Sequence, residues 1–292
     1  MDISMINKEK FINILNLFKK VYDARILYRK KWFFNIHENI NLLKKQLDFI
    51  TTIVTANTEI TNIPPTKGEK REIQKNSIIL LDLVNEICTL NNLTYWLDFG
   101  SLLGAVRHKG FIPWDDDIDI SMLRSDYNKI IKLLKNYNAN FIVREQLKNH
   151  LQIRLCTLDG KTGLDIFPVD EILITNDKKS KHNIEQRIKQ SYIIVNNLCS
   201  DKKLTSDINL LRSKIYEIQL KFVLNTNNKK DKKMLMYGID YPHTHPECIF
   251  DKKNIFPLKK EFFEGKQYPI PYNSKKHLIF LYGDFMSYPR WI

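Results

Sequence analysis

The chain has 292 residues, enough for one large domain or for one domain with a helical appendage. Apolar residues make up 43% and charged residues 27%, which argues against a wholly disordered chain, and nine glycines exclude a collagen-like or glycine-rich fibre. Basic residues outnumber acidic ones by 46 to 33, and this surplus of +13 suits either an anionic partner or a lysine-rich solvated surface.

Residues 1 to about 60 are predicted to be helical. Apolar residues recur there at helical spacing in two blocks: Phe11, Ile14, Leu15 and Phe18, then Leu42, Leu43, Leu47 and Ile50. Basic residues crowd between the blocks, so the segment could lie on a membrane or a partner, although we favour a helical hairpin packed on the main domain. Residues 61–70 contain two prolines and a glycine. We therefore predict a helical segment and linker over 1–70 and a second domain over 71–292.

From Glu72 onward the pattern predicts helices mixed with short strands. Leu80, Leu83, Val84 and Ile87 form a helical stripe that ends at Asn91-Asn92. Four elements are expected next, in this order: a strand over 93–97, a helix from Gly100 towards Arg107, a turn at Lys109-Gly110 and an acidic strand over 117–122. Ser125-Asp126 is expected to cap a further helix through Leu134.

The second half of the chain carries two hairpin signals. Residues 151–156 alternate in polarity, Asp159-Gly160 suits a tight turn, and 164–167 read as the return strand. Residues 176–235 are lysine-rich and mostly helical in pattern, and 262–268 resemble a second hairpin. Ser274 is expected to cap a final helix that Gly283 stops. This order of elements predicts an α+β or mixed α/β core, not a helix bundle.

An acidic run supplies the densest chemical signal. Asp115, Asp116, Asp117 and Asp119 place four carboxylates in five positions, and burying even two is unfavourable unless a cation neutralises them. On a strand, Asp117 and Asp119 share one face, and Asp115 joins them if the strand begins early. The run therefore predicts an oxygen site for Mg²⁺ or Mn²⁺, with an exposed acidic loop as the alternative.

Phosphate chemistry is suggested by residues on both sides of this run. Gly100 lets the backbone approach a phosphate, and the Ser101 hydroxyl and the first helical amides can donate to it. Asp165 projects opposite its apolar neighbours and could hold a metal or accept a proton from an attacking hydroxyl. Asp170 is a less well placed rival, and a local hydrogen bond at the strand end is the alternative for Asp165.

Three further groups of residues suit either a chemical role or an ordinary structural one. Arg107, His108 and Lys109 could offset charge on a diphosphate leaving group, or they could form a solvated turn. His243, His245 and Cys248 match no common zinc spacing, so a plain loop is expected. Four aromatic residues could surround the cationic group of an alcohol such as choline: Tyr95, Trp96, Trp114 and Tyr282. Packing in the core is the simpler interpretation.

Location is suggested by the cysteines and by the apolar runs. Cys88, Cys156, Cys199 and Cys248 stand far apart, which fits a reducing compartment better than a disulfide framework. Residues 1–20 lack the apolar block of a signal peptide, and no run reaches the roughly 18 apolar residues of a membrane span. We expect a soluble cytoplasmic protein that could still touch the inner face of a membrane.

Taken together, these residues resemble the LicD/fukutin family of phosphotransferases, whose catalytic domain has a nucleotidyltransferase fold. The run from Tyr95 to Asp119 resembles the family signature nearly throughout, and Asp165 to Pro168 also matches. Residues 281–286, followed by Pro289, are similar to the C-terminal signature. Ser101 stands where threonine is frequent, and the first 60 residues have no counterpart. The resemblance covers about 80–292 and implies a mixed sheet flanked by helices.

The resemblance also implies a chemistry. Gly100 and Ser101 would bind the donor phosphates, and Asp117, Asp119 and Asp165 would hold Mg²⁺ or Mn²⁺, with Asp115 as a candidate fourth ligand. Family members move a phospho-alcohol such as phosphocholine from a CDP-activated donor to a glycan or glycolipid acceptor of the lipopolysaccharide, capsule or teichoic acid type.

Three alternatives to this chemistry stay open. The chain could be a nucleotidyltransferase that acts on a small acceptor, or it could have a structural role in a glycan-assembly complex. It could also bind nucleic acid without catalysis, but we expect no such partner because the aspartates would repel a phosphate backbone.

Overall fold

The computed structural model describes residues 38–50, 52, 59–137, 141–145, 153–174, 232–238 and 249–288, with a few isolated residues between 186 and 217. The chain divides into two compact units, residues 1–58 and 59–292. In the first unit a helix covers 38–50, and the helical pattern predicted for 1–37 lies outside the described residues. The predicted apolar stripe is not the buried face of this helix. Phe49 is buried, whereas the side chains of the stripe are 49–63% exposed: Leu42, Leu43, Leu47 and Ile50. The functional division at 70–71 stays a prediction.

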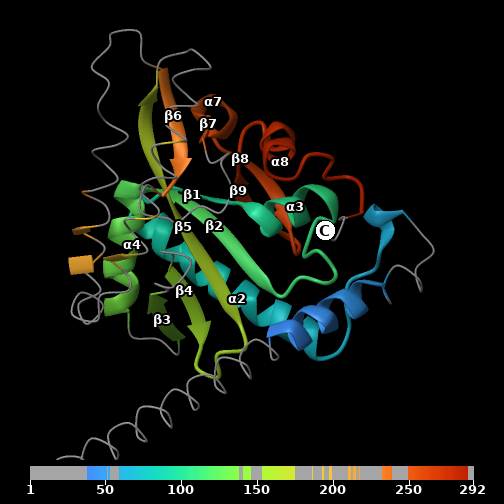
Figure 1. Cartoon of the computed structure of the whole chain (residues 1–292). Coiled ribbons are helices and arrows are strands. Elements are labelled where there is room, and N and C mark those ends of the chain that lie inside the picture. Colours follow the sequence, from blue (N-terminus) through green and yellow to red (C-terminus); the bar gives the residue numbers. More distant parts are fainter. Residues whose placement is uncertain are drawn as a thin grey trace, which may run out of the picture. The chain divides into compact units, whose positions relative to one another are not determined.

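A mixed seven-stranded sheet forms the centre of the second unit (Figure 1). Its central path runs β1-β2-β5-β4-β3, and β6 joins the far half of β5 and pairs with β7. Strands β2 and β5 are parallel, whereas the other pairs in the sheet are antiparallel. The strands are β1 Tyr95–Leu97, β2 Asp117–Leu123, β3 Phe141–Glu145, β4 Ile153–Thr157, β5 Gly163–Ile174, β6 Lys232–Tyr237 and β7 Ile249–Asp251.

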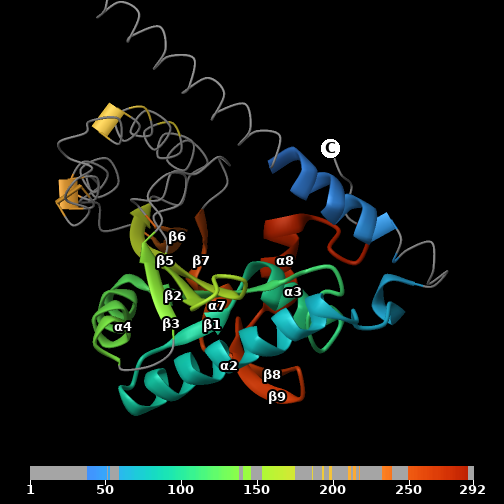
Figure 2. The same ribbon diagram turned by 90° about the horizontal axis from the view of Figure 1, so that it is seen from below.

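Helices and one separate hairpin surround this sheet. The helices are α2 Glu69–Leu90, α3 Phe99–Arg107, α4 Arg124–Asn136, α7 Lys252–Ile255 and α8 Ser274–Tyr282, with a short 3₁₀ turn, η2, at Ile60–Asn62. Strands β8 Lys259–Phe263 and β9 Lys266–Ile270 form the hairpin. Helix α2 runs along one side of the sheet, and α3 packs against α8 (Figure 2). The predicted class, a mixed sheet flanked by helices, is confirmed.

The hydrophobic core lies on the side of the sheet that α2 and α4 cover. Side chains alternate between the two faces of a strand, so register partners project from the same face of a sheet. The core-facing residues of the central strands are fully buried: Ile118, Ile120, Ile153, Leu155, Leu164 and Ile166. The residues between them along β2, β5 and β4 therefore project from the opposite face.

Several sequence-based boundaries were wrong, two of them because the residues pair with distant parts of the chain. Helix α4 begins at Arg124 without a side-chain cap, and the Asp126 carboxylate instead accepts a hydrogen bond from the Thr94 amide at 3.0 Å. Asn273 caps α8 through a bond from the Lys276 amide, so Ser274 is the first helical residue. Residues 232–235 belong to strand β6 and are not helical, because they pair with the extended half of β5.

The structure describes only part of the residues on which the predictions about cysteines and membrane spans depend. Cys88 and Cys156 are free and buried, whereas Cys199 and Cys248 lie outside the described residues. Among the helices of the described ranges, none combines the length and the apolar character that a bilayer crossing requires.

Candidate active site

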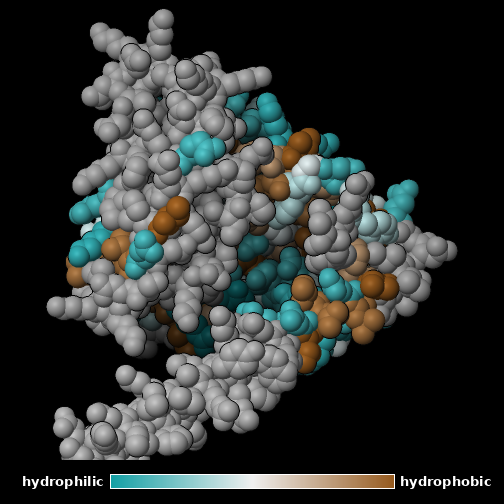
Figure 3. Space-filling model, in the orientation of Figure 1, coloured by the Kyte–Doolittle hydropathy of each residue, from teal (hydrophilic) through white to brown (hydrophobic). Residues whose placement is uncertain are grey.

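Three neighbouring strands place charged residues on the face of the sheet opposite the core. Asp119 in β2 is the register partner of Asp165 in β5, and Asp165 is in turn opposite Arg154 in β4. Asp117 lies two residues before Asp119 on the same face, opposite Gly163. The sheet therefore brings together the three aspartates predicted from the sequence, and it adds a guanidinium that the sequence did not indicate. Figure 3 shows hydrophilic residues gathered in a hollow in this region of the molecule.

Arg154 forms an ion pair with two of these carboxylates. Its Nη1 atom lies 2.8 Å from Asp165 Oδ2 and 3.4 Å from Asp117 Oδ2. Gly163 makes room for it, since a Cβ there would lie 2.3 Å from Arg154 Nε and 2.6 Å from Cζ. Because no side chain fills this position, the guanidinium can cross β5 to reach the neighbouring strand.

Asp119 is the carboxylate most affected by its surroundings. Burial, followed by the nearby charges of Asp117, Asp165 and Asp115, raises its pKa well above the usual range. The Gly100 amide donates to Asp119 Oδ2 at 3.2 Å, and this bond partly opposes the rise. Like charges held this closely favour either a shared proton or a bound cation.

The turn that begins α3 is built against this carboxylate. Ser101 Oγ accepts a hydrogen bond from the Asp119 amide at 2.9 Å, so the serine joins the helix to β2. A Cβ on Gly100 would lie 2.6 Å from Asp115 Oδ2 and 3.4 Å from Asp119 Oδ2, so only glycine lets both acids approach. Donor-phosphate binding by Gly100 and Ser101 stays a prediction.

Phe99, the first residue of α3, has a strained backbone. Its φ is +43°, which is unusual for a residue with a bulky side chain. The ring is held between Phe167 and Tyr237, with centroid distances of 4.7 and 4.8 Å, and the amide donates to Asp98 Oδ1 at 3.0 Å. Strain of this kind persists only where the surroundings enforce it, and it is typical of functional sites.

A buried polar network supports the turn from behind. Asp98 is fully buried, and its carboxylate accepts hydrogen bonds from Trp96 Nε1 at 3.0 Å and from the Tyr237 hydroxyl at 2.9 Å. His277 Nε2, from α8, lies 3.0 Å from Asp98 Oδ1. Burial alone would raise the pKa of Asp98, but the interaction with His277 and the hydrogen bonds lower it. No sequence pattern indicated a role for His277, which is 179 residues from its partner.

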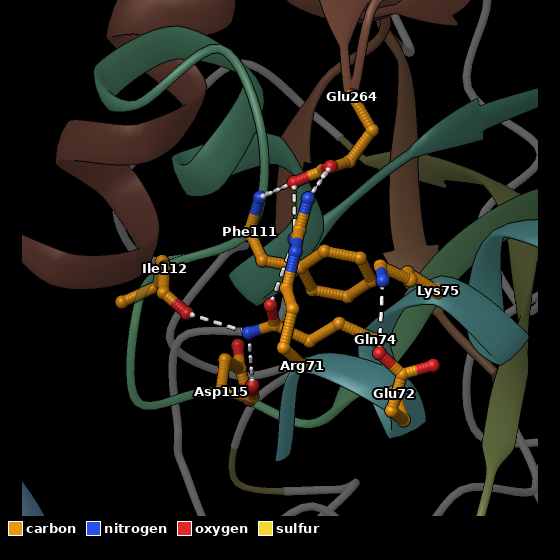
Figure 4. Close-up of polar contacts among 8 residues, drawn as sticks. All are labelled: Arg71, Glu72, Gln74, Lys75, Phe111, Ile112, Asp115 and Glu264. Atoms are coloured by element: carbon orange, nitrogen blue, oxygen red, sulfur yellow. Dashed lines mark hydrogen bonds and ion pairs between the residues drawn. The ribbon is translucent and has the colours of Figure 1, made fainter. Parts of the chain in front are cut away.

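The loop that carries the acidic run is fixed by α2 and by the β8–β9 hairpin (Figure 4). Gln74 Nε2 donates to the Asp115 carbonyl at 2.8 Å. Glu264 accepts two bonds from Arg71, at 3.1 and 2.6 Å, and one from the Phe111 amide at 3.1 Å. The site is formed on β2 and β5, but the loop that leads into β2 is therefore held in place by both α2 and the β8–β9 hairpin.

The predicted basic turn has partners within the protein. Arg107 is buried, donates to the Phe285 carbonyl at 2.7 Å and to His108 Nε2 at 3.0 Å, and burial lowers its pKa to about 10. Burial and Arg107 lower the pKa of His108 to about 4, so this ring is neutral. Lys109 Nζ lies 3.3 Å from Glu261, and both His108 and Lys109 line a cavity of about 260 Å³. Their role in donor binding stays a prediction.

The donor set suits a hard divalent ion. Asp115, Asp116 and Asp117 each offer a carboxylate oxygen, and these oxygens lie within 4.8 Å of one another. Mg²⁺ and Mn²⁺ prefer oxygen ligands of this kind. This group contains two of the predicted ligands and holds Asp116 in place of Asp119 and Asp165. The exact ligand set stays a prediction.

Other candidate residues are less central. Arg124 binds the buried Asp170 carboxylate at 2.9 and 2.7 Å, so that rival acid is engaged outside the cluster. Tyr95 and Trp96 are buried in the core, which supports packing over an aromatic box. Tyr282 is 44% exposed. The possible ligands near 243–248 lie outside the described residues.

Comparison with known proteins agrees with this arrangement. Residues 92–202 match the family described as LicD/FKTN/FKRP, nucleotidyltransferase domain. The lipopolysaccharide cholinephosphotransferase LicD of Haemophilus influenzae is 28% identical over 253 residues, 75% of this chain and 92% of that protein. An uncharacterized protein of Rickettsia prowazekii is 37% identical over 112 residues, 35% of this chain and 40% of that protein. Human ribitol 5-phosphate transferase FKRP is 42% identical over 52 residues, 18% of this chain and 10% of that protein.

The matched segment contains α3, the acidic strand and Asp165, which are the elements that build the site. Residues 92–202 therefore form a domain of the LicD/fukutin family of phosphotransferases.

Proposed function

We propose that this protein transfers a phospho-alcohol, such as phosphocholine, from a CDP-activated donor to a sugar hydroxyl of a surface glycan. The observation that carries this proposal is the register of the parallel strands, which pairs Asp119 with Asp165 beside Asp117. The similarity to a lipopolysaccharide cholinephosphotransferase and to a ribitol 5-phosphate transferase supports the substrate class. The cytoplasmic location and contact with the inner face of a membrane remain predictions.

The proposed chemistry uses a divalent ion, Mg²⁺ or Mn²⁺. Asp117, Asp119 and Asp165 would hold it, with Asp115 as a further candidate ligand. When bound, the ion would polarise the donor's phosphoryl oxygens and offset the charge of the leaving group. The raised pKa of Asp119, caused by burial and by neighbouring acids, is consistent with a site that gains from a cation.

The remaining steps fall to the protein's own residues. The turn at Gly100-Ser101 would hold the donor's diphosphate at the beginning of α3. The oxygen of the sugar hydroxyl attacks the phosphorus that carries the alcohol, and its proton passes to the Asp165 carboxylate. The bond between that phosphorus and the bridging oxygen breaks, and CMP leaves with the electron pair. Lys109 would offset the departing charge, whereas Arg107 is bonded to the Phe285 carbonyl and the His108 ring is neutral.

Product analysis tests this proposal. The full chain is incubated with Mg²⁺ or Mn²⁺, a crude glycan acceptor, and in turn CDP-choline, CDP-ribitol and CDP-glycerol. We expect release of CMP and a glycan that carries the phospho-alcohol, and loss of both when a chelator is added. A nucleotidyltransferase would instead attach CMP to the acceptor and release the free phospho-alcohol from the same donors, and that result would refute the proposal.

Variants then locate the activity. Asp117→Asn and Asp119→Asn should each lower turnover about a thousandfold, an estimate based on the loss of electrostatic stabilisation of the transition state. Asp159→Asn is the matched control, because that exposed carboxylate accepts hydrogen bonds from Thr157 and Lys161 within the β4–β5 turn. Wild-type turnover in either β2 variant would show that the chemistry takes place elsewhere.

A further inference from the structure

A single nitrogen of Arg154 bridges carboxylates from two different strands. Nη1 lies 2.8 Å from Asp165 Oδ2 and 3.4 Å from Asp117 Oδ2, while the guanidinium itself enters from β4. A positive centre thus already lies between two acids that are predicted to hold a divalent ion. The side chain is 27% exposed, so it can leave this position towards solvent without crossing the core.

The backbone is adapted to this placement. Gly163 is the register partner of Asp117, and a Cβ there would lie 2.3 to 2.6 Å from three atoms of the guanidinium. Any other residue at this position would push the guanidinium away from the acids. The neighbouring arginine on β3, Arg144, is the register partner of Arg154 and is exposed, which makes it a matched control.

The charges favour competition between the guanidinium and an ion. An arginine guanidinium keeps its proton in proteins, so the group that lies between Asp117 and Asp165 is positively charged. A bound Mg²⁺ lies about 2.1 Å from its ligand oxygens. Two cations cannot share the same two oxygens at these distances without strong repulsion.

We propose that Arg154 is the resident cation of the carboxylate site: it holds Asp117 and Asp165 together before the divalent ion binds, and it competes with that ion for their oxygens. Arg154 is therefore a positioning residue, and its charge weakens ion binding while stabilising the ion-free protein. This inference rests on the metal dependence included in the proposed function.

Direct binding of Mn²⁺ tests it without donor, acceptor or turnover. Free Mn²⁺ is measured by electron paramagnetic resonance while the full-length protein is titrated, and thermal unfolding is recorded with and without Mn²⁺. We expect Arg154→Gln to bind Mn²⁺ about tenfold more tightly than wild type, since a nearby like charge has been removed. Without Mn²⁺ the same variant should unfold at a lower temperature, and saturating Mn²⁺ should close the gap. Arg144→Gln should match wild type in both measurements.

A second variant displaces the guanidinium without removing its charge. Gly163→Ala should also tighten Mn²⁺ binding, and the double variant with Arg154→Gln should bind no more tightly than Arg154→Gln alone. If Arg154→Gln does not fold, Gly163→Ala carries the test.

The remaining outcomes distinguish the competition by Arg154 from the metal site itself. Equal or weaker Mn²⁺ binding by Arg154→Gln, with normal binding by wild type, would overturn the competition and leave the proposed function intact. Failure of wild type and of both variants to bind Mn²⁺ would overturn the metal site and this inference together.

Discussion

Replacing Asp98 by asparagine should destabilise the protein more than any single surface change. The carboxylate is fully buried and accepts bonds from Trp96 Nε1, the Phe99 amide and the Tyr237 hydroxyl, with His277 Nε2 at 3.0 Å. Asparagine keeps the shape but removes the charge and replaces one acceptor oxygen with a donor. Breaking a buried pair from one side costs about 3–5 kcal/mol, because the other partner stays buried without compensation.

Equilibrium unfolding in urea measures this loss. Trp96 lies within the network, so its fluorescence reports directly on the unit that contains the site. We expect a lower midpoint with an unchanged slope. For a unit of this size, about 2–4 °C per kcal/mol converts the loss to a fall in Tm of about 6–20 °C. Glu72→Gln serves as control, since that side chain is 66% exposed and an exposed pair such as Glu72–Lys75 contributes about 1 kcal/mol or less.

The losses from changing Asp98 and His277 should not be additive. His277→Gln should be destabilising alone, and the double variant Asp98→Asn/His277→Gln should lose less than the sum of the two single losses. A loss below about 1 kcal/mol for Asp98→Asn would refute this prediction. It would mean that asparagine satisfies the buried partners of Asp98 as well as the carboxylate does. Strict additivity would likewise refute the coupling of α3 to α8.

Three smaller perturbations test other contacts. Burial would raise the pKa of Glu264, but Arg71 and the Phe111 amide hold that pKa below its ordinary 4.5. The Glu264 carboxylate therefore stabilises the fold above pH 4.5, and this stabilisation is lost as the pH falls through the pKa of the folded protein. Glu264→Gln should abolish this pH-dependent part of the urea midpoint. Gly104→Ala should cost about 1–3 kcal/mol, because its Cβ would lie 2.4 Å from a carbonyl oxygen in the turn after α3, and Tm reports the loss. Ser101→Ala should cost about 1–3 kcal/mol by leaving the Asp119 amide without its acceptor, whereas Ser101→Thr should retain most of the stability, as urea unfolding of both will reveal.

The sequence predicts well those parts of the site that depend on local alternation. Asp117 and Asp119 share a face because strand side chains alternate, and the isoleucines beside them enter the core, as expected. The β4–β5 hairpin signal also placed Asp165 on the return strand, where it lies near the beginning of β5. From these local facts the convergence of the three aspartates required only that β2 and β5 be neighbours.

Residues whose roles depend on distant contacts were not predicted. In the sequence, Arg154 is one of several polar residues that alternate with apolar ones along a predicted strand. Its position opposite Asp165 depends on the register between β4 and β5, which the sequence pattern does not show. No prediction was made for Asp98, and its partner His277 belongs to α8. The predicted caps of α4 and α8 were each off by a residue or two. Asp126 binds the distant Thr94 amide, whereas the neighbouring Asn273 caps α8 in place of Ser274.

The bond between α3 and α8 also sets an order of events during synthesis. A nascent chain that has emerged as far as β5 already contains Asp117, Asp119 and Asp165, yet it still lacks the imidazole that the ribosome adds more than a hundred residues later. Until then Asp98 has no counterpart from α8, and the turn at Gly100 lacks its rear support. We expect unfinished or C-terminally clipped chains to be catalytically silent, which would spare the cell transferases that act before they are complete.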